Sequence, residues 1–153
     1  DKMDLSLELI KKAEANNVKI ILPKDVVIAD DIKEDAETEI VDIDNIPQDK
    51  EALDIGPKTA KEYADIIKDA KTVVWNGPMG VFEIKIFANG TNEVAKALAE
   101  SSATTIVGGG DSALAIEEAG YKDKITHVST GGGASLEFLE GKTLPGIDCI
   151  DEK

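Results

Sequence analysis

Short apolar segments that run into glycine-rich loops constrain the fold of this chain more than any other sequence feature. Residues 104–107 and 125–129 are rich in β-branched residues, and glycine triplets follow them closely, at 108–110 and 131–133. A similar segment, 72–75, precedes the loop Asn-Gly-Pro-Met-Gly. Apolar strands of roughly four to six residues that alternate with helices of about ten predict a parallel sheet covered by helices.

The predicted fold is therefore α/β: a parallel sheet flanked by helices on both faces, Rossmann-like and three-layered, with a small peripheral β element. Apolar spacing, capping residues and glycines predict helices at 5–15, 57–70, 91–101, 111–119 and 134–139. The predicted sheet strands are 19–22, 72–75, 104–107 and 125–129. The length of 153 residues suits one domain, so 1–153 is interpreted as a single domain.

The peripheral β element is predicted between residues 25 and 46. Two apolar runs, 26–28 and 40–41, lie there among many carboxylates. We expect outlying strands or a hairpin at the edge of the domain. The carboxylates are interpreted as a solvated face rather than a metal cluster.

The charge of the chain excludes some classes of partner. The formal net charge is −14, and all 17 basic residues are lysines. Such a surface repels nucleic acid and anionic membranes, so neither is expected as a partner. No apolar run approaches the roughly 20 residues of a membrane span, and no signal pattern is present. With Cys149 as the lone cysteine, a cytoplasmic location is expected.

The glycine loops indicate a phosphate-bearing ligand. Strand ends of a parallel sheet meet at one edge, where ligands bind, and helix N-termini there favour anions. The Walker pattern is absent. Residues 108–113 fit the loose dinucleotide fingerprint, but the next strand ends Val128-Ser129-Thr130 without the acid that binds a ribose. A dinucleotide-dependent oxidoreductase is therefore disfavoured.

Asp111 stands where the phosphates of a ligand would lie, at the start of a predicted helix. A bare carboxylate would repel phosphate. A Mg²⁺ ion between the two removes the conflict, because Mg²⁺ prefers one or two carboxylates plus phosphate oxygens. A plain helix N-cap is the alternative, and the two roles are compatible.

Five runs of sequence, in order, resemble the C-terminal signatures of the phosphoglycerate kinase family. The runs are residues 53–57, 73–83 (VVWNGPMGVFE), 106–113 (IVGGGDSA), 127–137 (HVSTGGGASLE) and 139–146. The resemblance implies a cytoplasmic glycolytic phosphotransferase. Its reaction moves a phosphoryl group from 1,3-bisphosphoglycerate to MgADP, giving 3-phosphoglycerate and MgATP.

The resemblance also implies roles for individual residues. Glu83 would hold the ribose hydroxyls, and Asn76 would contact the nucleotide phosphates. The residues that would cradle these phosphates are Gly109, Gly110, Asp111 and Ser112, with Asp111 facing Mg²⁺. The amides of Gly132 and Gly133 would meet the transferred phosphoryl group and are the candidate catalytic groups. Leu53 and Val81 would flank adenine, with Ala52 where the family usually has glycine.

Parts of the family pattern are not found in this sequence. A Gly-Gly-Ala-Lys segment and the phosphoglycerate-binding domain, with its catalytic arginine, would lie upstream. The chain is thus expected to be the nucleotide-binding part of a monomeric kinase, without the first part of that domain and inactive alone. Its expected partners are an adenine nucleotide and the missing domain in cis. The alternative is a stand-alone nucleotide-binding regulatory domain.

Overall fold

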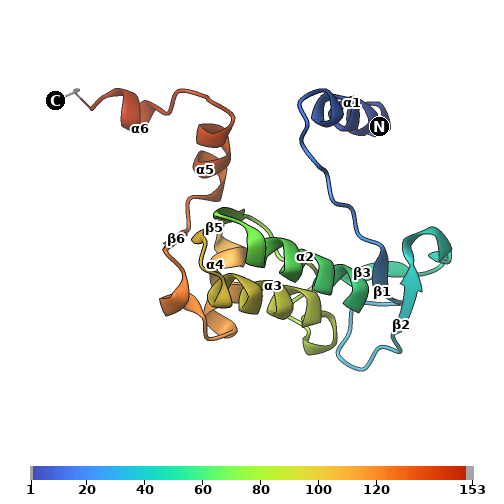
Figure 1. Ribbon diagram of the computed structural model, residues 1–153. Coiled ribbons are helices and arrows are strands. Elements are labelled where there is room, and N and C mark those ends of the chain that lie inside the picture. Colours follow the sequence, from blue (N-terminus) through green and yellow to red (C-terminus); the bar gives the residue numbers. More distant parts are fainter. Residues whose placement is uncertain (1, 151–153) are drawn as a thin grey trace.

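The computed structural model describes residues 2–150 and contains two sheets with helices around them (Figure 1). The helices are α1 (Met3–Ala15), α2 (Pro57–Asp69), α3 (Asn89–Glu100), α4 (Gly110–Glu118), α5 (Gly132–Leu139) and α6 (Pro145–Asp148). The strands are β1 (Asp25–Ala29), β2 (Glu39–Asp42), β3 (Glu51–Ile55), β4 (Thr72–Trp75), β5 (Thr104–Gly108) and β6 (His127–Ser129). Three short 3-10 helices cover Ile43–Asn45, Lys85–Phe87 and Lys122–Lys124.

The predicted parallel sheet is present, with strand order β4-β5-β6. One face of this sheet is packed by α2, α3 and α4. Its core is made of apolar side chains from these elements, among them Trp75, Val94, Leu98, Val107 and Ile116. Side chains alternate between the two faces along β4 and β5. Trp75 and Val107 pair in register, and both point into this core.

The other face of the parallel sheet is bordered by α5 and α6. Val74 and Ile106 point to this side, since they alternate with the core residues of their strands. Together with Phe138 and Leu139 of α5 and Ile147 of α6 they line an open apolar pocket of about 380 Å³. Helices thus flank both faces, and this confirms the predicted fold class.

The peripheral β element is an antiparallel sheet of order β2-β1-β3. The hairpin of β1 and β2 was predicted, but β3 was not. The carboxylates between residues 25 and 46 are, with one exception, exposed, as expected of a solvated face. Asp25 is the exception, at 0 % exposure, because its carboxylate accepts hydrogen bonds from the Lys58 and Thr59 amides and from the Thr59 hydroxyl.

The strand predicted at 19–22 is wrong. These residues form an extended connection between α1 and β1, without a strand partner among the described residues. The Tyr63 hydroxyl donates a hydrogen bond to the Ile21 carbonyl, 3.0 Å away. The segment has the apolar composition of a buried strand, but Ile20, Ile21 and Leu22 are exposed. Composition alone cannot supply a neighbouring strand, and pairing is what defines a sheet.

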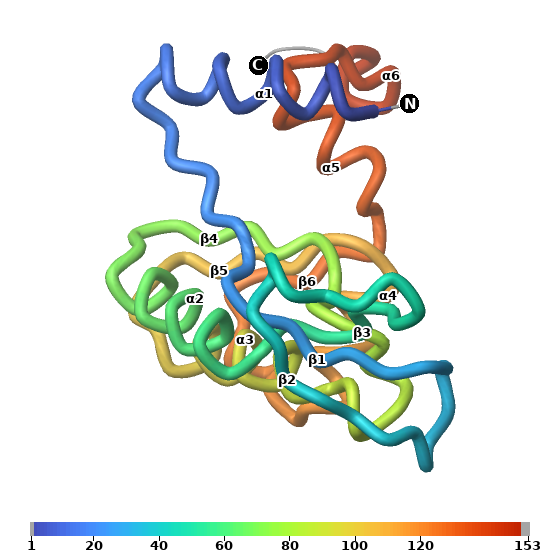
Figure 2. The backbone as a smooth tube through the Cα atoms, turned by 90° about the vertical axis from the view of Figure 1, so that its right-hand side faces the viewer, coloured from blue at the N-terminus to red at the C-terminus, as the bar shows by residue number. Residues whose placement is uncertain are grey.

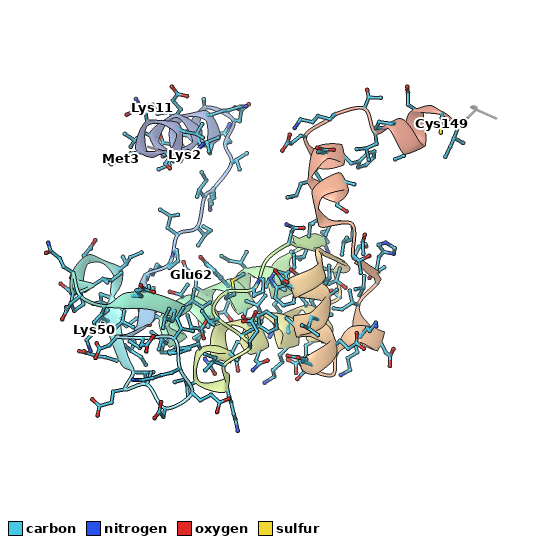
Figure 3. The ribbon with its side chains drawn as sticks, turned by 180° about the vertical axis from the view of Figure 1, so that it is seen from behind. Lys2, Met3, Lys11, Lys50, Glu62 and Cys149 are labelled. Carbon is cyan, nitrogen blue, oxygen red and sulfur yellow. The ribbon has the colours of Figure 1, made fainter. Side chains whose placement is uncertain are left out.

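The helices near the two ends of the chain lie on the same side of the sheets. Figure 1 shows α5 and α6 above the parallel sheet, and α1 on the same upper side but above the antiparallel sheet; Figure 2 shows all three helices above the two sheets. Figure 3 shows Met3 and Lys11 on α1, and Cys149 after α6, standing away from the packed elements. None of the residues of α1, α5 or α6 is buried. Among the described residues, no helix is both long and apolar enough to cross a bilayer.

Candidate functional site

The three predicted ligand loops meet at the carboxyl edge of the parallel sheet. Asn76 follows β4, Gly109 follows β5, and residues 130–133 follow β6. Because β5 is the central strand, its loop lies between the other two. Val107 is in register with Trp75, and Gly108 with Ser129. The alignment brings all three loops to one place, as the sequence predicted.

Glycine is required at 109 by the backbone conformation. Its φ angle is +98°, in the region that residues with a Cβ rarely adopt. The Gly109 amide donates to the Ser129 carbonyl at 3.0 Å, which ties the β5 loop to the end of β6. The Gly109 carbonyl accepts from the Ala113 amide at 3.0 Å and so begins α4. The turn therefore joins the end of β5 directly to the start of α4, beside the end of β6.

The first turns of α4 and α5 lie directly against each other. A Cβ placed on Gly132 would meet the Cα atom of Gly109 at 2.7 Å and the Asn76 Oδ1 atom at 3.3 Å. A Cβ on Gly108 would come within 3.0 Å of the same Asn76 oxygen. Asn76 and the two glycine loops thus form one continuous surface, which a side chain at Gly132 would disrupt.

These first turns leave backbone amides without intrahelical partners, as the first turn of every α-helix does. A Cβ on Gly110 or Gly133 would meet nothing within 4 Å, so the space beside them is open. Asp111 is exposed on the first turn of α4. Ser112 points the other way and is only 1 % exposed. A phosphate group could approach the open amides, with Asp111 beside it.

The residues expected to flank adenine lie at the other end of the loop that begins with Asn76. The Val81 amide donates to the Leu53 carbonyl at 2.9 Å, so β3 and this loop are joined where the resemblance puts the base. Leu53 is buried with Phe87 and Ala29, and Val81 packs against this cluster. Ala52 and Glu83 are exposed. Because they are exposed, the side chains of Ala52 and Glu83 are free to face a ligand.

Asp54 is a residue of this region that the sequence analysis did not assign. It lies in β3, is 3 % exposed, and accepts hydrogen bonds from the Gly90 amide at 2.8 Å and the Ile55 amide at 2.9 Å. Burial raises the pKa of Asp54 from 3.8 to about 6, against the opposing effect of the amides of Gly90, Ile55 and Asn89. An acid within an apolar strand was the signal that could have drawn attention to it.

A divalent ion could be held here by Asp111 together with oxygens of a bound phosphate. Within residues 2–150, no group of three or more histidine, cysteine, aspartate or glutamate residues is arranged to hold a metal by itself. One carboxylate beside open helix N-termini suits Mg²⁺, which usually arrives with its phosphate ligand and keeps several waters. The donor set therefore fits a metal–nucleotide complex.

Comparison with known proteins identifies the family. The family model described as phosphoglycerate kinase matches residues 1–142. The chain is 61% identical over 153 residues to the phosphoglycerate kinase of Clostridium botulinum strain Hall, and 58% identical to that of Finegoldia magna. All of this chain is covered in both comparisons, but only 38% and 39% of the relatives. The chain therefore spans less than half the length of these curated relatives.

Solved structures agree with these matches. The structure of phosphoglycerate kinase from Coxiella burnetii superposes with a TM-score of 0.91 at 45% identity, covering 96% of this chain and 38% of that one. Phosphoglycerate kinase from Pyrococcus horikoshii gives a TM-score of 0.74 at 36% identity over 96% of this chain and 37% of that one. In sequence and in fold, this chain belongs to the phosphoglycerate kinase family.

Proposed function

We propose that this chain is part of the nucleotide-binding domain of a phosphoglycerate kinase and contributes the site for MgADP and MgATP. The observation that carries the proposal is the contact between Gly132 and Gly109, beside Asn76. This contact brings the N-termini of α4 and α5 and the side-chain amide of Asn76 together at one place. Such an arrangement suits the phosphates of a nucleotide better than it suits any uncharged ligand.

The residues of the proposed site divide into a phosphate side and a nucleoside side. On the phosphate side, Asn76 and the amides of Gly110 and Ser112 would bind the nucleotide phosphates, and Asp111 would face Mg²⁺. Gly109 would form the turn that presents these amides, since its own amide is bonded to the Ser129 carbonyl. On the nucleoside side, Leu53 and Val81 would flank the base near Ala52, and Glu83 would bind the ribose. The loop from Asn76 to Glu83 connects the two sides.

The amides of Gly132 and Gly133 would bind the phosphoryl group in transfer. Phosphoryl transfer depends on positioning and on neutralising charge, and hydrogen-bond donors held in place before the reaction do both. Mg²⁺, arriving with the nucleotide, would offset the negative charge of the phosphates. The reaction proposed for the longer protein converts 1,3-bisphosphoglycerate and MgADP into 3-phosphoglycerate and MgATP, in glycolysis.

The phosphoglycerate side of this reaction would come from another part of the longer protein. The chain carries no arginine and has a net charge of −14. A phosphoglycerate-binding domain in cis would supply the cations that its anionic substrate requires. We therefore propose that residues 1–153 alone bind nucleotide weakly and do not turn over substrate.

A calorimetric titration tests the proposal. The chain is titrated with MgADP, and with ADP in the presence of EDTA. We expect weak binding that depends on Mg²⁺, and a loss of about tenfold or more in MgADP affinity for Asp111→Asn. Glu118→Gln, an exposed carboxylate at the opposite end of α4, is the matched control and should bind as the unaltered chain does.

The outcomes separate the alternatives. No binding of MgADP, or equal binding with and without Mg²⁺, would contradict the proposed site. Tight MgADP binding would favour a stand-alone regulatory domain instead. An increase in NADH fluorescence on mixing with the chain would favour a dinucleotide-binding domain. A coupled assay for 3-phosphoglycerate formation should give no turnover.

A further inference from the structure

The loop between β4 and α3 is held in place by contacts to two other elements. The Met79 amide donates to the Thr91 hydroxyl of α3 at 3.0 Å. The Val81 amide donates to the Leu53 carbonyl of β3 at 2.9 Å. The position of the loop, and with it of Val81 and Glu83, therefore depends on how β3 and the first turn of α3 sit relative to each other.

Asp54 connects these two elements. Its Oδ1 atom accepts from the Ile55 amide within β3, and its Oδ2 atom accepts from the Gly90 amide in the first turn of α3. The residue at the N-cap of α3, Ala88, makes no side-chain capping hydrogen bond. Asp54 thus supplies from β3 the acceptor that α3 lacks locally, and its charge suits a helix N-terminus.

The same carboxylate also touches the loop. A Cβ on Gly80 would lie 2.5 Å from the Asp54 Oδ1 atom, 2.6 Å from the Leu53 carbonyl oxygen and 2.7 Å from the Phe87 carbonyl oxygen. The loop backbone therefore lies against Asp54 at the residue just before Val81. A displaced carboxylate would leave this turn without the surface it rests on.

We propose that Asp54 is a positioning residue for the nucleoside side of the site. By joining β3, the first turn of α3 and the Gly80 turn, it sets where Val81 and Glu83 stand, while it touches neither base nor ribose itself. The inference rests on the proposed nucleotide function and deepens it. It separates the two sides of the site, since the phosphate side is built by Asn76 and the glycine loops, without Asp54.

The experiment compares two ligands and two matched variants. Asp54→Asn and Asp25→Asn each alter a buried carboxylate that accepts amides at a helix N-terminus, but Asp25 lies at α2, where its hydrogen bonds go to Lys58 and Thr59 rather than to the loop. Affinities are measured for MgADP and for magnesium pyrophosphate, which has no base or ribose. Unaltered folding is checked by circular dichroism.

A selective effect is the expected result. Asp54→Asn should weaken MgADP binding by about tenfold, as the loss of one well-placed contact does, and leave magnesium pyrophosphate binding within about twofold. Asp25→Asn should leave both affinities unchanged. Equal losses for both ligands, or equal effects of the two variants, would overturn the inference. An unaltered chain that binds neither ligand would contradict the nucleotide function, and this inference with it.

A second variant covers the case in which Asp54→Asn does not fold. Gly80→Ala leaves the carboxylate in place but pushes the turn away from it, because the added methyl group has no room. The same selective loss of MgADP affinity is expected. If Gly80→Ala weakens MgADP and magnesium pyrophosphate equally, or neither of them, Asp54 does not act through this turn and the inference is wrong.

Discussion

The Asp25 carboxylate and the Thr59 hydroxyl lie 2.6 Å apart and close the N-terminus of α2, although 34 residues separate them in the sequence. Thr59 returns the interaction, because its hydroxyl oxygen also accepts from the Lys24 and Asp25 amides. Both side chains are 0 % exposed. Hydrogen bonds exchanged in both directions fix the start of α2 against β1, and so connect the antiparallel sheet to the helix that covers the parallel one.

Removing this pair should destabilise the chain. Asp25→Ala leaves two amides and a hydroxyl without their acceptor, and a loss of about 2–4 kcal/mol in the free energy of unfolding is expected. Thr59→Val, which removes only the hydroxyl, should cost about 1–2 kcal/mol. Urea unfolding followed by circular dichroism measures both. Glu34→Ala, an exposed carboxylate of the same segment, should change stability by less than about 0.5 kcal/mol.

The two buried carboxylates should respond to pH in opposite directions. Burial alone would raise the pKa of Asp25, but hydrogen bonds from Thr59 and Lys58 outweigh it and hold the pKa below 3.8. The folded chain therefore releases this proton more readily than the unfolded chain, so the stabilisation from Asp25 is present at neutral pH and lost in acid. Relative to Asp25→Asn, the unaltered chain should lose stability below about pH 4.

For Asp54 the sign is reversed. Its pKa is raised from 3.8 to about 6, so between these values the folded chain keeps a proton that the unfolded chain has released. Stability therefore falls as the pH rises from about 4 to about 6, and then levels off. Unfolding measured at several pH values should show this slope in the unaltered chain and lose it in Asp54→Asn. The same slope in both would contradict the assignment.

Gly132 should tolerate no side chain, whereas its neighbour should. Gly132→Ala places a methyl group 2.7 Å from the Gly109 Cα atom, so α4 and α5 must separate and MgADP affinity should fall by about tenfold or more. Gly133→Ala meets open space and should leave the melting temperature unchanged or slightly raised. Calorimetry and thermal melting of both variants check the difference. Equal thermal effects would show that the close approach is unimportant.

The apolar groove on the second face of the parallel sheet should bind hydrophobic dyes. Phe138 and Leu139 are 60% and 61% exposed, and Val74 lines the same groove. Exposed apolar side chains gathered in one place form a patch that water solvates poorly. We expect fluorescence enhancement of an anilinonaphthalene dye, reduced by Phe138→Ser. Ile32→Ser, at an exposed apolar residue outside the groove, should leave the enhancement unchanged.

Much of the fold could be predicted from residue 57 onward because each segment there has a local cause. Pro57 begins α2, Gly120 follows α4, and the glycine triplets follow β5 and β6. The convergence of the loops was also predictable, because parallel strands place their carboxyl ends at one edge. In such segments neighbours in the sequence decide the conformation.

The remaining features depend on residues distant in sequence. Asp25 was expected to be solvated because it begins an acidic segment, but α2 supplies three donors to it. β3 was missed because its pairing with β1 could not be anticipated from its own residues. The strand expected at 19–22 was wrong for the opposite reason, since its composition suits a strand but no strand within residues 2–150 pairs with it. The presence or absence of a partner far along the chain decided all three.

The contacts of Asp54 have a consequence for how this chain can evolve. Gly80 and Gly90 both lie close to the Asp54 Oδ1 atom, and a methyl group on either glycine would be 2.5 Å from it. A survey of single substitutions would mark all three positions as intolerant, although none of them touches the proposed ligand. Compensating changes would have to arrive together, so descendants should keep the trio intact or replace it as a unit.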